Sequence, residues 1–589
     1  MPRTTLALTS FVSGEFGNKL TGRTDFDKYS SAAKTMENFL VHPQGAATRR
    51  VGTQFIDEVK DSSKKTRLIP FEFSTTQTYI LEFGDQYIRF FKDKGQILSS
   101  GSAYEIASPY LEAELFDIKF AQSADVMYIC HPNHPVKKLS RTGHTSWTLA
   151  TVSFGGSPSP GITGSNDRPS SVSFYEQRLV FAGTNNNPQT LWFSKAGDYE
   201  NFTTGTNADD AMIYTIASNQ VNAIKYLKAQ RTLVVGTTGG EFTVSADGTD
   251  ASITPTNVTI KKQSSYGSSN VDAVTAGNAI LFLQKAKRKI RELQYNFDSD
   301  SYVAPDLCIL NDTVTKSGIN EMAFQQEPNS IVWCVRDDGV LAALTYQRSE
   351  SVVAWTRHIF GGVFGSGNAV CESVASISGV LTEDELWIIV KRTINGATKR
   401  YVECFSDFEF DEASAEDFKF LDSHLTYSGS STTTLSGLGH LEGQSVSILA
   451  DGSVHANKTV SSGAITLDRA VTKACVGLSY DSVLQTMRIE GGAAEGTSQG
   501  KTKRISKVVL RLFETVGVKV GPSLSNLETV PFRTTSSSLS SPVDTLIEGD
   551  KEIEFNDDYN SDGFIFIKQD QPLPCSVLSV YPTLVTSDG

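Results

Sequence analysis

Three oxygen-bearing side chains near the end of the chain have the spacing of a calcium-binding loop. Asp558, Asn560 and Asp562 occupy alternate positions and are followed by Gly563, and such a loop begins with alternating side-chain oxygens before a glycine. Its twelfth position, which needs a glutamate that binds through both oxygens, is Gln569. The residues after Gly563 are FIFIK, which is typical of a strand. Two interpretations stay open: a calcium site at these three residues, or a polar turn that opens a hairpin.

A second group of possible metal ligands lies in the segment CHPNH. Cys130, His131 and His134 carry sulfur and nitrogen donors of the kind that zinc prefers. Two prolines flank the histidines and no fourth ligand stands nearby in the sequence. Histidine and proline are ordinary residues in a turn between two strands, so we expect a turn here and no bound cofactor.

Patterns for catalysis are incomplete. GTSQGKT, from Gly496 to Thr502, is one residue short of a phosphate loop and follows no apolar strand, so we expect a flexible loop. The pairs Asp337/Asp338 and Asp384/Glu385 could serve a glycan hydrolase or lyase only if carboxylates converged at one site, and solvated hairpin turns explain them as well. Neither a GxSxG elbow nor an HExxH motif occurs. The sequence therefore predicts a protein that is not an enzyme.

Length and charge exclude other classes. A chain of 589 residues exceeds what one hydrophobic core supports, so several domains are expected. The net charge is −13, and a protein that grips nucleic acid by its phosphates is usually basic. No apolar run approaches the ~20 residues of a membrane helix, and the N-terminal apolar stretch is too short for a signal peptide. Seven scattered cysteines without a CxxC predict free, partly buried thiols in a protein made in a reducing cytoplasm.

Seven segments share one pattern of three short apolar strands separated by turn residues. They run from Leu68 to Lys92, Phe116 to Ser140, Ser171 to Lys195, Asn222 to Ala246, Asp272 to Tyr295, Asn320 to Tyr346 and Glu372 to Phe405. Their spacing of about 50 residues suits propeller blades of four strands each. A run of unrelated hairpins in sandwiches is the alternative. We predict a mainly β fold with a propeller-like array of about seven units.

The ends of the chain differ from this array. In Phe26 to Leu40 the apolar residues recur with helical spacing and predict one amphipathic helix, with Asp25 as a cap. A polar loop containing Arg49 and Arg50 is expected next. Residues Ser423 to Ser436 are rich in serine, threonine and glycine and predict a linker or exposed loop. The predicted domains are a docking segment at 1–60, the propeller-like domain at 61–421, and small β domains at 422–485 and 486–589.

Several separate blocks resemble one protein family. The segment from Leu8 to Phe55 is similar to the opening of the tail nozzle (tail tubular protein B-like) proteins of short-tailed bacteriophages, and so is the segment from Gln177 to Phe202. VVGTTGGEFTVS, LEGQSVSILADG and IKQDQPLPCSVLSVYP also fit, so the likeness spans nearly the whole chain. One departure is Val51, where the resemblance would place a proline.

The resemblance implies a structural virion protein in the phage tail. It implies a homo-hexameric ring below the portal and the tail adaptor protein, with side surfaces that hold tail fibre proteins. Viral DNA would pass through the ring during genome ejection without sequence-specific binding, and about −80 charges on six copies would keep it from adhering. A tail fibre or spike that recognises host surface glycan is the alternative, although such proteins are usually trimers along β-helices and no short solenoid repeat is present.

Overall fold

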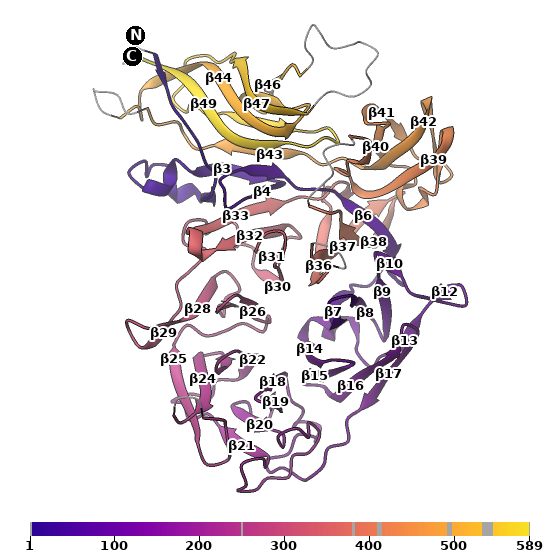
Figure 1. The fold of residues 1–589 in the computed structure, drawn as a ribbon, viewed down its shortest axis with the longest axis vertical. Helices are drawn as coiled ribbons and strands as arrows, with labels where there is room; N and C mark the ends of the chain where they lie inside the picture. Colours follow the sequence, from indigo (N-terminus) through magenta and orange to yellow (C-terminus); the bar gives the residue numbers. More distant parts are fainter. Residues whose placement is uncertain are drawn as a thin grey trace.

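The computed structural model describes residues 3–248, 251–379, 383–408, 415–491, 497–532 and 546–587. Within these ranges the regular secondary structure is almost entirely strand, as predicted, and the helical segments are short 3-10 turns. None of those turns has the length or apolar character to span a membrane. Seven sheets are arranged around a common centre, and the C-terminal sheets lie beside both termini at one end of the long axis (Figure 1).

Each of the seven predicted repeat segments lies in a sheet of its own, in which the neighbouring strands of the segment pair antiparallel. The first three sheets contain β7 (Arg67–Ser74), β8 (Gln77–Gly84), β9 (Tyr87–Lys92), β10 (Gly95–Gln96) and β13 (Glu105–Ala107); β14 (Lys119–Ser123), β15 (Val126–His131), β16 (His134–Gly143) and β17 (Ser146–Thr151); and β18 (Ser171–Tyr175), β19 (Arg178–Ala182), β20 (Thr190–Phe193) and β21 (Met212–Thr215). The next three contain β22 (Ile224–Ala229), β23 (Leu233–Thr237), β24 (Gly240–Ala246) and β25 (Val258–Ser264); β26 (Val274–Ala276), β27 (Ala279–Leu283), β28 (Ile290–Asn296) and β29 (Ser301–Val303); and β30 (Ile319–Gln325), β31 (Ile331–Arg336), β32 (Leu341–Gln347) and β33 (Val352–His358). The seventh contains β36 (Val370–Ile377), β37 (Glu385–Ile394), β38 (Ala397–Phe405) and β6 (Thr53–Glu58).

Apolar clusters lie between successive sheets all the way round the ring. The cluster that closes the ring packs Ile80 and Phe91 of the first sheet against Trp387 and Val402 of the seventh. Every sheet is therefore covered on both faces by its neighbours, which explains why central strands such as β19 and β27 are buried at every position instead of alternating. The predicted propeller-like array is confirmed by this arrangement.

The buried carboxyl of Glu82, on β8, makes the stability of the ring depend on pH. Burial raises the pKa of Glu82 to about 7, although Tyr87 donates a hydrogen bond to it. Well below pH 4.5 the Glu82 carboxyl is protonated in the folded and in the unfolded chain. As the pH rises from there, the carboxyl ionises first in the unfolded chain, so the free energy of unfolding falls until the pH passes about 7. The difference between the folded and the unfolded pKa of Glu82 corresponds to a loss of about 3 kcal/mol in the free energy of unfolding. We expect Glu82→Gln to remove this loss, measured as a flatter plot of urea midpoint against pH, whereas Glu548→Gln at an exposed site should leave the plot unchanged. A plot for Glu82→Gln parallel to that of the parent would contradict this reading.

The predicted N-terminal helix over Phe26 to Leu40 is wrong. A 3-10 turn at Asp27–Tyr29 leads instead into β3 (Ala32–Glu37) and β4 (Phe39–Val41). Most apolar residues of the helical pattern are buried all the same, because β3 lies between β33 and the C-terminal strand β43 (Ser482–Thr486). Asn38 separates the two strands in the left-handed conformation, with φ of 56°. Tertiary pairing has overridden the local periodicity.

Short strands of the N-terminal segment join the ring to the C-terminal sheets. The strands β2 (Gly14–Glu15) and β3 connect β33 of the sixth sheet to β43, within one sheet of ten strands. The strand β6 connects β38 of the seventh sheet to β39, within a sheet of eight. The other strands of these two sheets and of the third C-terminal sheet are β1 (Arg3–Thr5), β5 (Ala47–Arg49), β39 (Asp422–Ser436), β40 (Ser445–Ala450), β41 (Ser453–Thr459), β42 (Ala464–Leu478), β44 (Thr502–Thr515), β45 (Lys519–Ser523), β46 (Asn526–Thr529), β47 (Ile547–Glu554), β48 (Phe566–Gln569) and β49 (Ser576–Ser587).

The predicted linker at Ser423 to Ser436 is also wrong, because these residues form most of the long strand β39. Its first residues are fully buried and its middle is exposed, and it pairs with β42 over nearly its whole length. Serine and threonine suit an exposed strand as well as a loop, so composition alone did not distinguish the two.

All seven cysteines are free and buried, as the sequence predicts for unpaired thiols. Burial raises the pKa of each thiol, which suppresses the reactive thiolate. We expect the native protein to show almost no reaction with a soluble disulfide reagent at pH 8, and all seven thiols to react in denaturant. Rapid labelling of any cysteine in the native chain would show that its neighbourhood opens.

Candidate functional site

The N-terminal segment meets the ring and the C-terminal sheets at a buried cluster of charged residues, which we call the junction cluster: Arg50, Thr53, Arg392, Glu403 and Asp422. Arg50 donates to both oxygens of Asp422, at 2.8 and 2.7 Å, and neither side chain is exposed. Thr53 donates to Glu403 at 2.6 Å, and Glu403 is paired in turn with Arg392. The cluster joins the N-terminal segment to the seventh sheet and to the start of β39, which are both distant from that segment in sequence.

Further contacts hold both arginines of the predicted polar loop. The expectation of an exposed loop is wrong, since Arg49 and Arg50 are 2% and 0% exposed. Arg49 donates to the carbonyl oxygens of Leu573 and Tyr480, at 2.8 and 3.0 Å. The Arg50 guanidinium stacks on the ring of Tyr480 at 3.8 Å and donates to Asn38 at 2.9 Å. These contacts satisfy most donors of the two buried cations, as burial of charge requires, whereas Nε of Arg49 is buried without a hydrogen-bond partner among the described residues.

Electrostatics keep the central pair of the junction cluster charged. Burial alone would raise the pKa of Asp422, but attraction to Arg50 and hydrogen bonds from Arg50 and Gly361 hold it below its ordinary value. Asp422 in turn raises the pKa of Arg50 against the effect of burial. His358, next to this pair, has its pKa lowered by burial and by Arg50, so it stays neutral.

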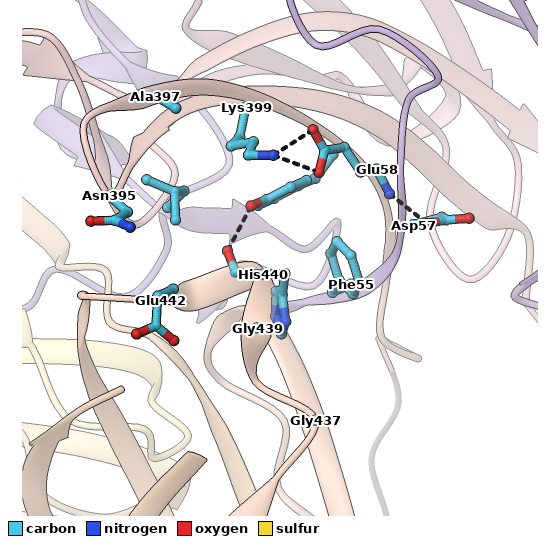
Figure 2. Close-up of a pocket in the computed structure, with 12 residues that line it drawn as sticks. Phe55, Asp57, Glu58, Asn395, Ala397, Lys399, Gly437, Gly439, His440 and Glu442 are labelled. Carbon is cyan, nitrogen blue, oxygen red and sulfur yellow. Dashed lines mark hydrogen bonds and ion pairs between the residues drawn. The ribbon is translucent and has the colours of Figure 1, made fainter. Parts of the chain in front are cut away.

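A hollow of about 500 Å³ opens beside this junction, between β6, the turn from β37 to β38, and a 3-10 turn at Gly439–Leu441 (Figure 2). Several of its polar groups already have partners, although Nδ1 of His440 is buried without one among the described residues. Lys399 binds both oxygens of Glu58 at 2.9 Å, and the Tyr401 hydroxyl donates to the carbonyl oxygen of His440 at 2.6 Å. His440 stacks on Phe55 at 4.0 Å, and burial lowers its pKa to about 4. The contacts of Tyr401 and Phe55 with His440 join β38 and β6 of the seventh sheet to the 3-10 turn before β40.

The calcium-loop candidates do not gather around one point. Asn560 accepts hydrogen bonds from the backbone nitrogens of Asp562 and Gly563, at 2.9 and 2.7 Å, and so forms a turn. Asp562 pairs with Arg488 at 2.7 Å. Gln569 lies in β48 and donates to the carbonyl oxygen of Val516, inside the core. Calcium binding at Asp558, Asn560 and Asp562 stays a prediction that these contacts do not favour.

In the CHPNH segment, the structure brings His131 and His134 together with Glu114, which sequence analysis missed because it lies upstream in a 3-10 turn. His134 is 2.7 Å from a Glu114 oxygen. Nδ1 of His131 accepts a hydrogen bond from the Asn133 backbone at 3.1 Å, which places the proton of the neutral ring on Nε2. A metal ligand needs the opposite tautomer, with the second nitrogen donating. Cys130 instead belongs to the apolar cluster between the second and third sheets.

The acidic pairs considered for catalysis are engaged in ion pairs and hydrogen bonds with other parts of the chain or with their own turns. Asp338 pairs with Arg336, and Asp337 accepts from Asn320. Asp384 accepts from the backbone nitrogens of Gln326 and Glu327, and Glu385 accepts from the indole nitrogen of Trp387 at 2.9 Å. In the GTSQGKT segment Gly496 lies outside the described residues.

No protein-family model and no curated protein matches this sequence. Among solved structures, the chain is similar to the Cps50 (Swd1) β-propeller domain of Myceliophteria thermophila, with 10% identity and a TM-score of 0.36 over 60% of this chain and all of that one. It is also similar to the RRP9 WD40 repeats, with 9% identity and a TM-score of 0.38 over 61% of this chain and all of that one. The propeller-like arrangement follows from the pairing of the strands and the packing of the sheets in this chain.

Proposed function

We propose that this protein is a structural subunit of the tail nozzle of a short-tailed bacteriophage and that it is not an enzyme. The observation that carries the proposal concerns the segment from Leu8 to Phe55, the longest block that resembles this family. Its strands β2, β3 and β6 are the ones that join the ring to the C-terminal sheets. A subunit in the wall of a tube needs such pairing between its domains, because force on one domain must pass to the others without the domains moving relative to one another.

Charge and partners fit the same proposal. A chain of net charge −13 would line a channel for DNA without holding it, because like charges repel. We propose a homo-hexamer in the virion tail, bound to the tail adaptor protein above and to tail fibre proteins at its sides. Heterologous contacts between identical copies generate such rings when the rotation closes.

The test is to image the purified chain by negative stain, alone and with the adaptor protein of the same virion, and to count copies by native mass spectrometry. We expect rings or tubes of six copies with an axial opening that bind the adaptor. Stable monomers that never join the adaptor would refute the proposal. Elongated trimers would refute it too and would favour a receptor-binding fibre or spike.

A further inference from the structure

A cavity of about 250 Å³ lies at the axis of the seven-sheet ring. Its lining comes from the innermost strands β7, β14, β22, β26, β30 and β36, so six of the seven sheets contribute. Most neighbouring innermost strands contact one another around the axis, including β36 with β7 where the ring closes. The cavity is therefore framed by rigid strands, and it is smaller than the ~300–1,000 Å³ of pockets for drug-sized ligands.

Much of the wall is apolar. Phe120 comes from β14 of the second sheet, and Phe116 comes from the 3-10 turn before that strand. Met322 and Phe324 come from β30. Val271 adds an aliphatic surface from the segment before β26. These side chains suit a ligand with a compact apolar body, since burial of apolar surface would favour its entry.

The charged side chains of the cavity do not balance. Arg67 pairs with Glu321 at 2.8 Å, and Lys119 pairs with Asp272 at 2.9 Å. Lys228, which is partly buried on β22, also lines the cavity, and its ammonium has no hydrogen-bond or ion-pair partner among the described residues. Asp272 is the carboxylate in the lining that attracts both lysines, Asp117 outside the lining also attracts Lys119, and burial lowers the pKa of both lysines. One positive charge is left over in a poorly solvated place, where an unpaired charge is unfavourable.

We propose that the axial cavity binds a small monocarboxylate with an apolar body, its carboxylate on Lys228 and its body on the phenylalanine side of the wall. The single negative charge of such a ligand would neutralise the one positive charge of the lining that has no partner in the described part of the chain. Inorganic phosphate would bring more charge than the cavity lacks and would leave the apolar wall uncovered. The site differs from the junction cluster and does not depend on the proposed place in a tail, so its test can succeed or fail on the isolated chain.

The test is isothermal titration of the purified chain with 3-phenylpropionate, and with 3-phenylpropionamide as the uncharged match. We expect binding of the acid at one site per chain and at least tenfold weaker binding of the amide. Lys228→Met should weaken the acid by at least tenfold, whereas Lys225→Met, on the same strand but outside the cavity lining, should not change it.

The acid and amide are compared on the unaltered protein, so the result does not depend on how a variant folds. Equal binding of the two probes, absence of binding by the acid, preference for inorganic phosphate, or equal losses in the two lysine variants would each overturn the proposal. Loss of an unpaired charge should also leave the thermal midpoint of Lys228→Met no lower than that of the parent.

Discussion

Asp422→Asn should lower the free energy of unfolding by about 3–5 kcal/mol, because it leaves the Arg50 guanidinium buried without its counter-charge. Asp422 accepts both guanidinium hydrogen bonds and one from Gly361, and its side chain is fully buried. The amide keeps the shape of the side chain but offers one acceptor in place of two. The measurement is the midpoint and slope of urea unfolding at neutral pH, followed by tryptophan fluorescence.

The matched control is Asp550→Asn. Asp550 also binds an arginine through both oxygens, at 2.7 and 2.9 Å from Arg511, but both side chains are nearly half exposed. An exposed pair contributes about 0–1 kcal/mol, so this variant should be close to the parent. If the two variants lost the same stability, the junction cluster would not be what fixes the ring to the C-terminal sheets.

Gly52→Ala should destabilise the chain by about 3 kcal/mol or more, because the added methyl group has nowhere to go. A Cβ atom on Gly52 would stand 1.9 Å from the carbonyl oxygen of Leu421 and 2.5 Å from its nitrogen. Both are backbone atoms and cannot rotate aside. Gly52 donates to Lys419 at 2.7 Å and accepts from Ser406 at 3.0 Å, so the close approach is where the N-terminal segment crosses the chain leaving the ring.

Gly22→Ala is the control for this substitution. Gly22 is exposed, and no atom lies within 4 Å of the position its Cβ would take. A surface change of this kind is usually within about 0.5 kcal/mol of the parent. The comparison is made by urea unfolding and by limited proteolysis, in which Gly52→Ala should be cut faster near the junction. Equal stability of the two variants would mean that the N-terminal segment is loosely held.

The ring was largely predictable because its signals are local. Runs such as VMYIC and IVWCV are β-branched, aromatic and bounded by turns, and they form β15 and β31 at nearly those limits. Burial on both faces follows from the repeat, since each sheet needs two neighbours.

The junction could not be predicted because its partners are remote. Arg50 and Asp422 are 372 positions apart, and no pattern in the sequence near either residue predicts their pairing. In the 3-10 turn and β3 together, the spacing of Tyr29, Ala33 and Met36 imitates a helix, and only the pairing of β3 with β33 and β43 gives a strand instead. The surplus lysine at the ring axis likewise appears only when six sheets are brought together.

The claim on which the proposed function rests is that the N-terminal strands bind the ring and the C-terminal sheets into one rigid body. Native-state hydrogen exchange of the whole chain tests it most directly, since local opening and global unfolding give different protection. We expect amides of β3 and β6 to exchange as slowly as those of β31 and β37, the central strands of the sixth and seventh sheets. Exchange in β3 and β6 that is orders of magnitude faster would contradict the account, because the segment would then open while the ring stayed folded.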